Sequence, residues 1–376
     1  MSNPFAPTFG VSPAILKGRE HLVSAFGKSL DSGIGDPRRA LLISGPKGFG
    51  KTVTLNIIED EAAAHGWVVL RAQPHNLVQP LVDTVIPQTI AALKREGLKR
   101  HFGVAKHTST SNTKQNTQNE NVSSAPSLIS SLNALCDVVG PESGVLVSVD
   151  EVQSIDPSEL WELATTIQDL RRDNRQIAFA AAGLPAGINE LLRHPGATFL
   201  QRSQQLSLTP LSPEETREIL STTAQKGGLT LEGEVLDDAV KLTRGYPFLI
   251  QLLGYHLYEQ AAARDGVVTA DDLRAVTPDV LDTLGQLIHK PALAGIPNSQ
   301  MEYLRAMAEL QEGEKPVSTG AIAERLHKEP RDLSMPRHGL IERELVYSPQ
   351  RGYLNFIIPH MSHHLLYGGT RDMGWD

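Results

Sequence analysis

The sequence predicts an α/β protein with three parts: a three-layer domain on a parallel sheet, a helical lid, and an α+β winged helix-turn-helix domain. Three observations support this. Short apolar runs alternate with helix-like stretches as far as about residue 210, helices alone follow, and three helices and a hairpin pattern come last. We expect the parts to span 1–210, 211–287 and 299–367, with a linker at 288–298 and a tail at 368–376.

The first part alternates strand and helix patterns. Strands are expected at 40–43, 67–72, 144–149, 176–182 and 205–208. Helical patterns precede the first strand and separate the others, and Pro80 and Pro87 interrupt the one at 77–99. Residues 103–126 are mostly Ser, Thr, Asn, Gln and Lys, so they cannot bury enough apolar surface to offset their ordering entropy. We predict that this stretch is a disordered insertion.

A phosphate-loop pattern follows the first expected strand and precedes a helix. It reads Gly45-Pro46-Lys47-Gly48-Phe49-Gly50-Lys51-Thr52, and Val53 continues into the helix. Backbone N–H groups of such a loop surround phosphate oxygens, and the helix adds the positive end of its dipole. We expect Gly48 and Gly50 to allow positive φ or close approach of a polyphosphate. Lys51 would reach the β and γ phosphates, and the Thr52 hydroxyl would bind Mg²⁺.

An acidic pair ends the strand expected at 144–149. Asp150 would hold Mg²⁺ directly or through water, and Glu151 would orient or deprotonate the attacking water. An acidic pair at a strand end is by itself common. Together with the upstream loop, the segment resembles a Walker B strand.

Composition limits the class of protein. The chain has 376 residues, 40% of them hydrophobic, with a net charge of -8 and a pI near 5.9, so a generally basic nucleic-acid coat is excluded. Cys136 is the only cysteine, which excludes an internal disulfide and points to a small core residue. No signal peptide or membrane-spanning pattern is found, and we expect a cytoplasmic protein that does not associate with membranes.

The second part reads as helices only. Ser212 to Glu215 forms a capping-box pattern with proline in the first turn, and Thr269 to Asp272 repeats it. In the last part, helices are expected around 304–310, at 319–326 and at 333–344, followed by strands at 345–349 and 353–358. This order predicts a winged helix-turn-helix domain.

Taken together, these segments resemble AAA+ ATPases of the origin-recognition-like branch, a group that includes bacterial ATP-binding proteins with a C-terminal winged helix. The resemblance covers most of the chain. The matching segments are 18–20, 45–52, 147–151, 182–185, 244–247 and the winged-helix tail. The resemblance implies that the first part is a P-loop (AAA+) domain. ATP is favoured over GTP because no guanine-reading Asn-Lys-x-Asp segment is present.

The resemblance also implies binding residues outside the loop. Gly18 and Arg19 would lie near the adenine, and Tyr246 and Pro247 would close the lid over the base. Arg244 falls near the lid's phosphate-sensing position, or alternatively caps the end of its helix electrostatically.

Arginine and sensor positions are less well defined. Arg202 lies where these proteins carry an arginine finger that reaches a neighbour's γ-phosphate, with Arg193 as a rival and a surface ion pair as the ordinary alternative. The strand at 176–182 ends in alanines, where many relatives place a polar side chain that positions water. Gln153 is a candidate substitute. Slow hydrolysis, or a switch that mainly holds nucleotide, is therefore expected.

The winged-helix tail carries basic residues suited to DNA phosphates: Lys328, Arg331, Arg337 and Arg351. Acidic residues share the same stretch, and Pro336 would disturb a recognition helix unless it lies in the first turn. The histidines at 360, 363 and 364 are expected to form a polar helix face rather than a metal site.

These observations predict a Mg²⁺-dependent ATPase whose nucleotide state rearranges the lid and a DNA-binding winged helix. The alternative is an ATP/ADP-dependent signalling or scaffold switch whose winged helix binds a protein partner, and self-association stays open in both.

Overall fold

The computed structural model describes residues 2–8, 10, 13, 15, 17–96, 126–193, 200–262, 264 and 266–368. The insertion predicted at 103–126 therefore lies outside the described residues, except for Pro126. The chain forms two compact units, which we describe separately. The sheet unit comprises Arg19–Gly45 and Lys51–Leu208, and the helical unit comprises Met1–Gly18, Pro46–Gly50 and Thr209–Asp376.

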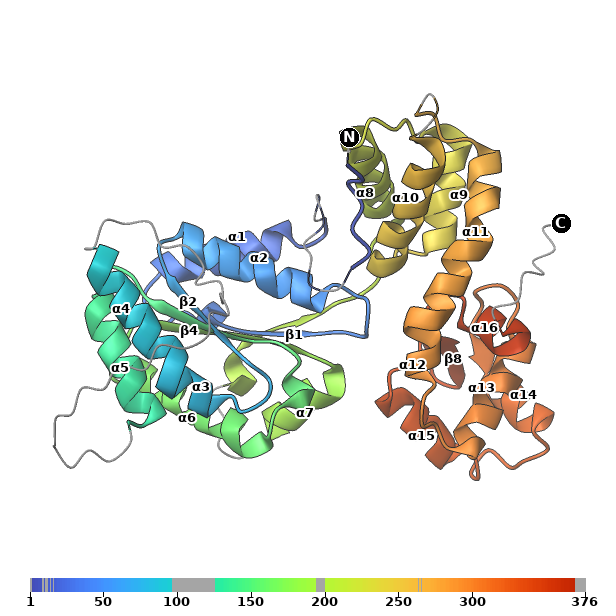
Figure 1. Cartoon of the computed structure of the whole chain (residues 1–376). Coiled ribbons are helices and arrows are strands. Elements are labelled where there is room, and N and C mark those ends of the chain that lie inside the picture. The colour runs from blue at the N-terminus through green and yellow to red at the C-terminus, as the bar shows by residue number, and fades with distance from the viewer. Residues whose placement is uncertain are drawn as a thin grey trace. The chain divides into compact units, whose positions relative to one another are not determined.

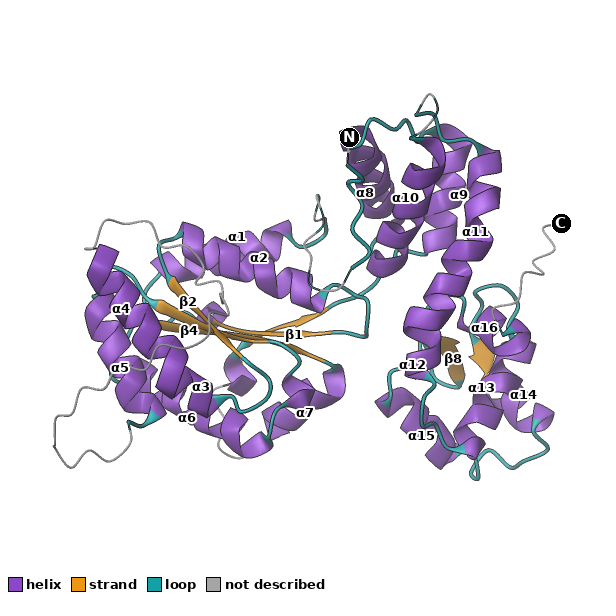
Figure 2. Ribbon diagram, viewed as in Figure 1, coloured by secondary structure: helices purple, strands orange, loops and turns teal. Residues whose placement is uncertain are grey.

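The sheet unit is a three-layer α/β structure, as predicted (Figures 1 and 2). Its five strands are β1 (Ala40–Ser44), β2 (Val68–Ala72), β3 (Val145–Val149), β4 (Ile177–Gly183) and β5 (Gln204–Ser207). Their order is β2-β3-β4-β1-β5, and every pairing is parallel. The strands β3 and β4 are buried along their whole length, which explains their continuous apolar sequence.

Helices cover both faces of this sheet (Figure 2). The helices α1 (Glu20–Asp31) and α2 (Lys51–Ala64) lie on one face. The other face packs against α4 (Ile86–Glu96), α5 (Leu128–Val139), α6 (Pro157–Arg172) and α7 (Pro185–Arg193). The stretch between Pro80 and Pro87 is partly π-helical, because Leu81–Val85 forms a π turn between α3 (Val78–Pro80) and α4. The predicted interruption is thus a local change in helix type.

The helical unit contains α8 (Pro213–Lys226), α9 (Gly233–Thr243), α10 (Pro247–Ala261) and α11 (Ala270–Leu284). Both predicted capping boxes are confirmed: Ser212 pairs reciprocally with Glu215, and Thr269 with Asp272. Part of the expected linker at 288–298 is helical, since α11 continues through a π turn (Gly285–His289) into α12 (Lys290–Ala292).

The C-terminal part has the order expected of a winged helix. It contains α13 (Asn298–Leu310), β6 (Val317–Ser318), α14 (Thr319–Arg325), α15 (Ser334–Glu342), β7 (Val346–Tyr347), β8 (Tyr353–Phe356) and α16 (Met361–Tyr367). Its small antiparallel sheet has the order β6-β8-β7. Pro336 is the third residue of α15, so its missing N–H falls in the first turn, where helices leave N–H groups unpaired. None of the helices in the described ranges is long and apolar enough to cross a bilayer.

Candidate functional site

The phosphate-loop segment joins the carboxyl end of β1 to the first turn of α2, as the sequence predicts. Gly48 and Gly50 have φ angles of +79° and +85°, which residues with a Cβ adopt only with strain. Gly45 is required for another reason, because a Cβ there would lie 2.9 Å from the Leu208 Cβ. Lys51 starts α2 and is buried, at 7% exposure.

Tyr246, at the start of α10, packs on the loop within the helical unit. Its hydroxyl donates a hydrogen bond of 2.8 Å to the carbonyl oxygen of Lys47, and its ring makes an edge contact with Phe49 at 5.3 Å. The Phe248 N–H donates to the carbonyl of Gly48 at 3.2 Å. A Cβ on Gly48 would overlap the Tyr246 hydroxyl. Gly48 is thus required by a protein side chain, a reason that the sequence did not reveal.

Thr52 and Asp150 meet at the carboxyl edge of the sheet. The Thr52 hydroxyl donates a hydrogen bond of 2.7 Å to Oδ2 of Asp150, which follows β3 directly. The Glu151 N–H donates to Oδ1 of Asp150 at 2.8 Å. A hydroxyl beside a carboxylate is the kind of oxygen pair that Mg²⁺ accepts alongside its waters and phosphate oxygens. The two predicted metal ligands therefore lie together and fit Mg²⁺.

Glu151 and Gln153 form a second polar group beside this pair. Glu151 has left-handed backbone angles (φ 53°, ψ 47°), a strained conformation for this residue type. The Gln153 amide nitrogen donates to the Glu151 carboxylate, and its oxygen accepts from the Leu184 N–H at 2.9 Å. Gln153 thus lies at the end of β4, where the alanines leave no polar side chain. Gly187 is close by, because a Cβ on it would approach the Gln153 Cβ to 2.7 Å.

Gly18 and Arg19 belong to different units. Gly18 has a φ of +75°, and a Cβ there would lie 2.5 Å from Oε1 of Glu215, so it packs on the start of α8. Arg19 is the residue before α1. Val53 lies in the first turn of α2, and Pro247 is the first residue of α10, where a missing N–H has no cost.

Arg244 ends α9 in a left-handed conformation (φ 51°) and forms an ion pair with Glu314, in the loop between α13 and β6. Burial lowers the pKa of Arg244, and the charge of Glu314 opposes that effect. The two roles considered from the sequence were phosphate sensing and helix capping. The structure adds a third, a link from the lid to the C-terminal part.

Histidines reinforce this link. The His360 Nε2 lies 2.8 Å from the carbonyl oxygen of Leu242 in α9, and burial lowers the pKa of His360 to about 3. The His289 Nε2 lies 2.9 Å from the Pro359 carbonyl, and burial lowers its pKa to about 4. The expectation of a polar helix face is therefore wrong for His360, which precedes α16 and contacts α9. It failed because the tertiary contact with α9 is invisible in the local sequence.

Arg202 lies just before β5, at the amino edge of the sheet. The phosphate loop leaves the opposite, carboxyl edge of the neighbouring β1. A five-residue strand separates these edges by roughly 16 Å. Arg202 therefore lies far from the carboxyl end of β1, where the phosphate loop begins. Its rival Arg193 ends α7 and is exposed.

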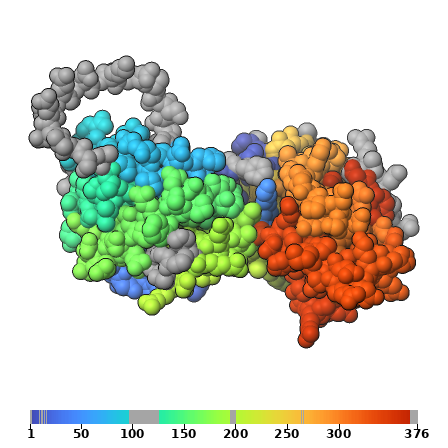
Figure 3. Space-filling view, turned by 90° about the horizontal axis from the view of Figure 1, so that it is seen from below, coloured from blue at the N-terminus to red at the C-terminus, as the bar shows by residue number. Residues whose placement is uncertain are grey.

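The four predicted DNA-contacting residues lie before α15, on it, or in the turn between β7 and β8. The C-terminal part of the chain, which contains these elements, is drawn orange to red in Figure 3. Lys328 forms an ion pair with Glu302 at 3.1 Å, and Arg331 lies 3.7 Å from Asp332. Among the residues the structure describes, neither Arg337 nor Arg351 has an acidic partner within 4 Å. Met335, which lies on α15 with Arg337, is 76% exposed.

Residues 15–179 match the family model described as AAA ATPase domain. Residues 286–365 match a second model, described as a domain of unknown function. The match at 15–179 confirms the predicted resemblance to the AAA+ group and the prediction of an ATPase. No curated protein was found to match the chain in sequence.

Solved structures show the same fold along almost the whole chain. The ORC2 protein of Aeropyrum pernix, in ADPNP and ADP complexes, is 19% identical, with a TM-score of 0.64 and coverage of 96% of both chains. A Walker-type ATPase of Pyrococcus abyssi is 14% identical, with a TM-score of 0.61 and coverage of 93% of this chain and 96% of its own. At these identities the likeness confirms the predicted fold class.

Proposed function

We propose that this protein binds and hydrolyses Mg²⁺-ATP and uses the nucleotide state to control its C-terminal domain. The single observation that carries the control step is the junction between α9 and α10. Tyr246 and Phe248 in this junction contact the phosphate loop, and Arg244, two residues before Tyr246, contacts Glu314 in the C-terminal part. A change in the loop thus has a short path to that domain.

The chemistry assigned to the site follows from its side chains. Lys51 and the N-terminus of α2 stabilise negative charge on the phosphates, and Thr52 and Asp150 supply the oxygen ligands of Mg²⁺. Bound Mg²⁺ neutralises charge on the phosphate oxygens. Glu151 accepts a proton from the attacking water, and Gln153 holds the Glu151 carboxylate in place. Arg202 serves the site only in a second copy of the chain.

Turnover of ATP tests the first part of this proposal. Lys51→Ala should abolish ATP hydrolysis, since a full positive charge leaves the phosphate site. Glu151→Gln should retain bound nucleotide and lose turnover by a factor of about 10² to 10⁴, typical of a general base. Lys28→Ala, an exposed lysine on α1, is the control and should retain full turnover. Equal turnover in Lys51→Ala and wild-type protein would contradict the proposal.

For the C-terminal domain we propose binding to duplex DNA through α15 and the β7–β8 turn. The support is the absence of acidic partners around Arg337 and Arg351 in the described part of the chain. Replacing both with glutamine should weaken DNA binding and lower its salt dependence by about two phosphate contacts. Unchanged DNA affinity and salt slope in that variant would exclude this surface.

A protein partner is the second candidate, and a separate observation favours it. Lys328 is neutralised by Glu302, and Met335 and Ile341 on α15 are exposed at 76% and 39%. Exposed apolar side chains on a helix are typical of protein recognition. In this case DNA binding would be absent at low salt, and Met335→Glu would block capture of the partner.

A further inference from the structure

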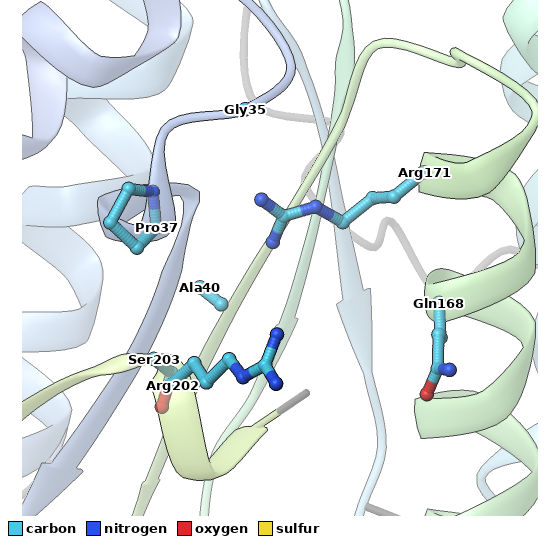
Figure 4. A pocket seen from close by; sticks show the side chains of 7 residues that line it. All are labelled: Gly35, Pro37, Ala40, Gln168, Arg171, Arg202 and Ser203. Atoms are coloured by element: carbon cyan, nitrogen blue, oxygen red, sulfur yellow. The ribbon is translucent and has the colours of Figure 1, made fainter. Parts of the chain in front are cut away.

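A hollow of about 350 Å³ lies at the amino edge of the sheet, away from the phosphate loop. Its lining comes from the start of β1, the end of α6 and the turn before β5: Gly35, Pro37, Ala40, Gln168, Arg171, Arg202 and Ser203. Figure 4 shows the side chains of Arg171 and Arg202 entering the same space from different elements. All of these residues belong to the sheet unit.

Neither guanidinium group forms an ion pair with a carboxylate within 4 Å among the described residues, although the charge of Asp36 acts on Arg171. Arg171 is half-buried, and its Nη2 donates to the carbonyl oxygens of Ile34 and Asp36 at 3.2 and 3.1 Å. A guanidinium has five N–H donors, so others are left for a ligand. Arg202 forms no hydrogen bond or ion pair within the part of the chain described. The Asp36 carboxylate is bound by Arg38 through Nε at 2.9 Å.

A third arginine, Arg39, adds positive charge next to the hollow. Arg39 is fully buried and donates to the carbonyl oxygens of Ser29 and Leu30. Burial lowers the pKa of Arg39, and the charge of Arg171 lowers it further, so the two cations are close. The charge of Asp36 opposes the effect of burial on Arg39 and Arg171, yet the pKa of each stays lowered, so this partly desolvated region favours an added anion.

We propose that this hollow, the Arg171–Arg202 site, binds a small organic phosphate. Guanidinium groups match the geometry of phosphate oxygens and bind them through paired N–H donors. The volume is in the range of small-molecule sites and exceeds what a phosphate group alone fills. Pro37 and Ala40 provide an apolar wall for the remainder of the ligand, and the Gln168 amide provides a polar contact.

Calorimetric titration of the full chain with ribose 5-phosphate tests this proposal. The protein carries Lys51→Ala, which removes phosphate binding at the phosphate loop. Binding is expected, and adding Arg202→Gln should weaken it roughly tenfold or more, the effect of losing charged hydrogen bonds. Arg172→Gln is the matched control, because Arg172 is exposed on the same helix and does not line the hollow. It should leave the affinity within about twofold.

Two further titrations test whether the ligand is an organic phosphate or free phosphate, and whether Arg171 contributes to binding. Weaker binding of inorganic phosphate than of ribose 5-phosphate supports an organic ligand, whereas equal affinity overturns that part and assigns the site to the free ion. Arg171→Lys keeps the charge and loses the paired donors, so its affinity should fall. Thermal unfolding checks that this variant stays folded after losing the bonds to Ile34 and Asp36. Absence of binding, or an equal loss with Arg172→Gln, overturns the Arg171–Arg202 site. These affinities are measured without ATP turnover, so they test the Arg171–Arg202 site separately from the proposed ATPase function.

Discussion

Replacing Tyr246 with phenylalanine tests whether the lid orders the phosphate loop. The change removes only the hydroxyl that donates to the Lys47 carbonyl at 2.8 Å. The ring contacts with Phe49 at 5.3 Å and with Phe248 at 6.4 Å stay in place. Tyr246 is 1% exposed, so water does not readily replace the lost donor.

The expected magnitude follows from this one hydrogen bond. A buried hydrogen bond between neutral groups contributes about 1 kcal/mol, and leaving its acceptor unsatisfied costs about 1–3 kcal/mol. If the bond pre-orders the loop for phosphate, most of this loss appears in nucleotide binding, because the loop must then be ordered on association. ATP affinity should fall about five- to tenfold, at about 1.4 kcal/mol per factor of ten.

Calorimetry with Mg²⁺-ATP measures the affinity, and urea denaturation measures the free energy of unfolding. Tyr255→Phe is the matched control, since Tyr255 lies on the same helix with its side chain 37% exposed. This control should change neither quantity by more than about 0.5 kcal/mol. If Tyr246→Phe binds ATP within twofold of wild type while losing 1 kcal/mol or more of stability, Tyr246 only packs the lid, and the reasoning is refuted.

Three other predictions concern the remaining contacts. Gln153→Ala should lower ATP turnover by about tenfold or more, because the bond to Glu151 is lost, and should leave ATP affinity unchanged. The control is Ser154→Ala, an exposed neighbour, which should turn over ATP at the wild-type rate. Equal rates in the two variants would show that Gln153 does not position Glu151. Glu314→Gln should uncouple the C-terminal domain from the nucleotide site, so that hydrogen exchange in α14 and α15 no longer responds to ATP. The control Glu312→Gln should keep this response. A response retained in both variants would show that the Arg244–Glu314 ion pair does not transmit the nucleotide state. The folded-state pKa values of His360 and His289, about 3 and about 4, lie below the ordinary 6.5, so their contribution to stability is complete above about pH 6.5 and is lost as the pH falls toward 4 and 3. At pH 5 each of these two histidines should lower the free energy of unfolding by about 2 kcal/mol, as measured by urea denaturation across pH. His360→Asn, which tolerates the left-handed backbone at φ 60°, should flatten this dependence, and the exposed His338→Gln should not; an unchanged slope in His360→Asn would contradict the assignment.

Much of the site could be placed from the sequence because its signals are local. The strand, glycine loop and helix order at 40–64 is written in consecutive residues, and Asp150 follows an apolar run that is typical of a buried parallel strand. In a parallel sheet the carboxyl ends share one edge, so the meeting of Thr52 and Asp150 follows from topology. The capping boxes at Ser212 and Thr269 are likewise patterns of four residues.

Other features depend on residues far apart in the chain. Gln153 was only a candidate from the sequence, and its bond to the Leu184 N–H shows that it fills the space at the alanine-ended strand. The pairing of Arg244 with Glu314 had no sequence signal, because an arginine near a helix end fits several roles equally well.

The sequence by itself determined the phosphate loop, the acidic strand end and the order of helices and strands, since backbone propensity and short-range patterns fix these. Tertiary structure alone decided what surrounds them. It placed Gly48 against Tyr246, paired Arg244 with Glu314, packed the half-buried His360 against α9, and brought Arg171 and Arg202 to one hollow. The physical reason is that packing selects among partners that lie tens to hundreds of residues away, and no local pattern records that choice.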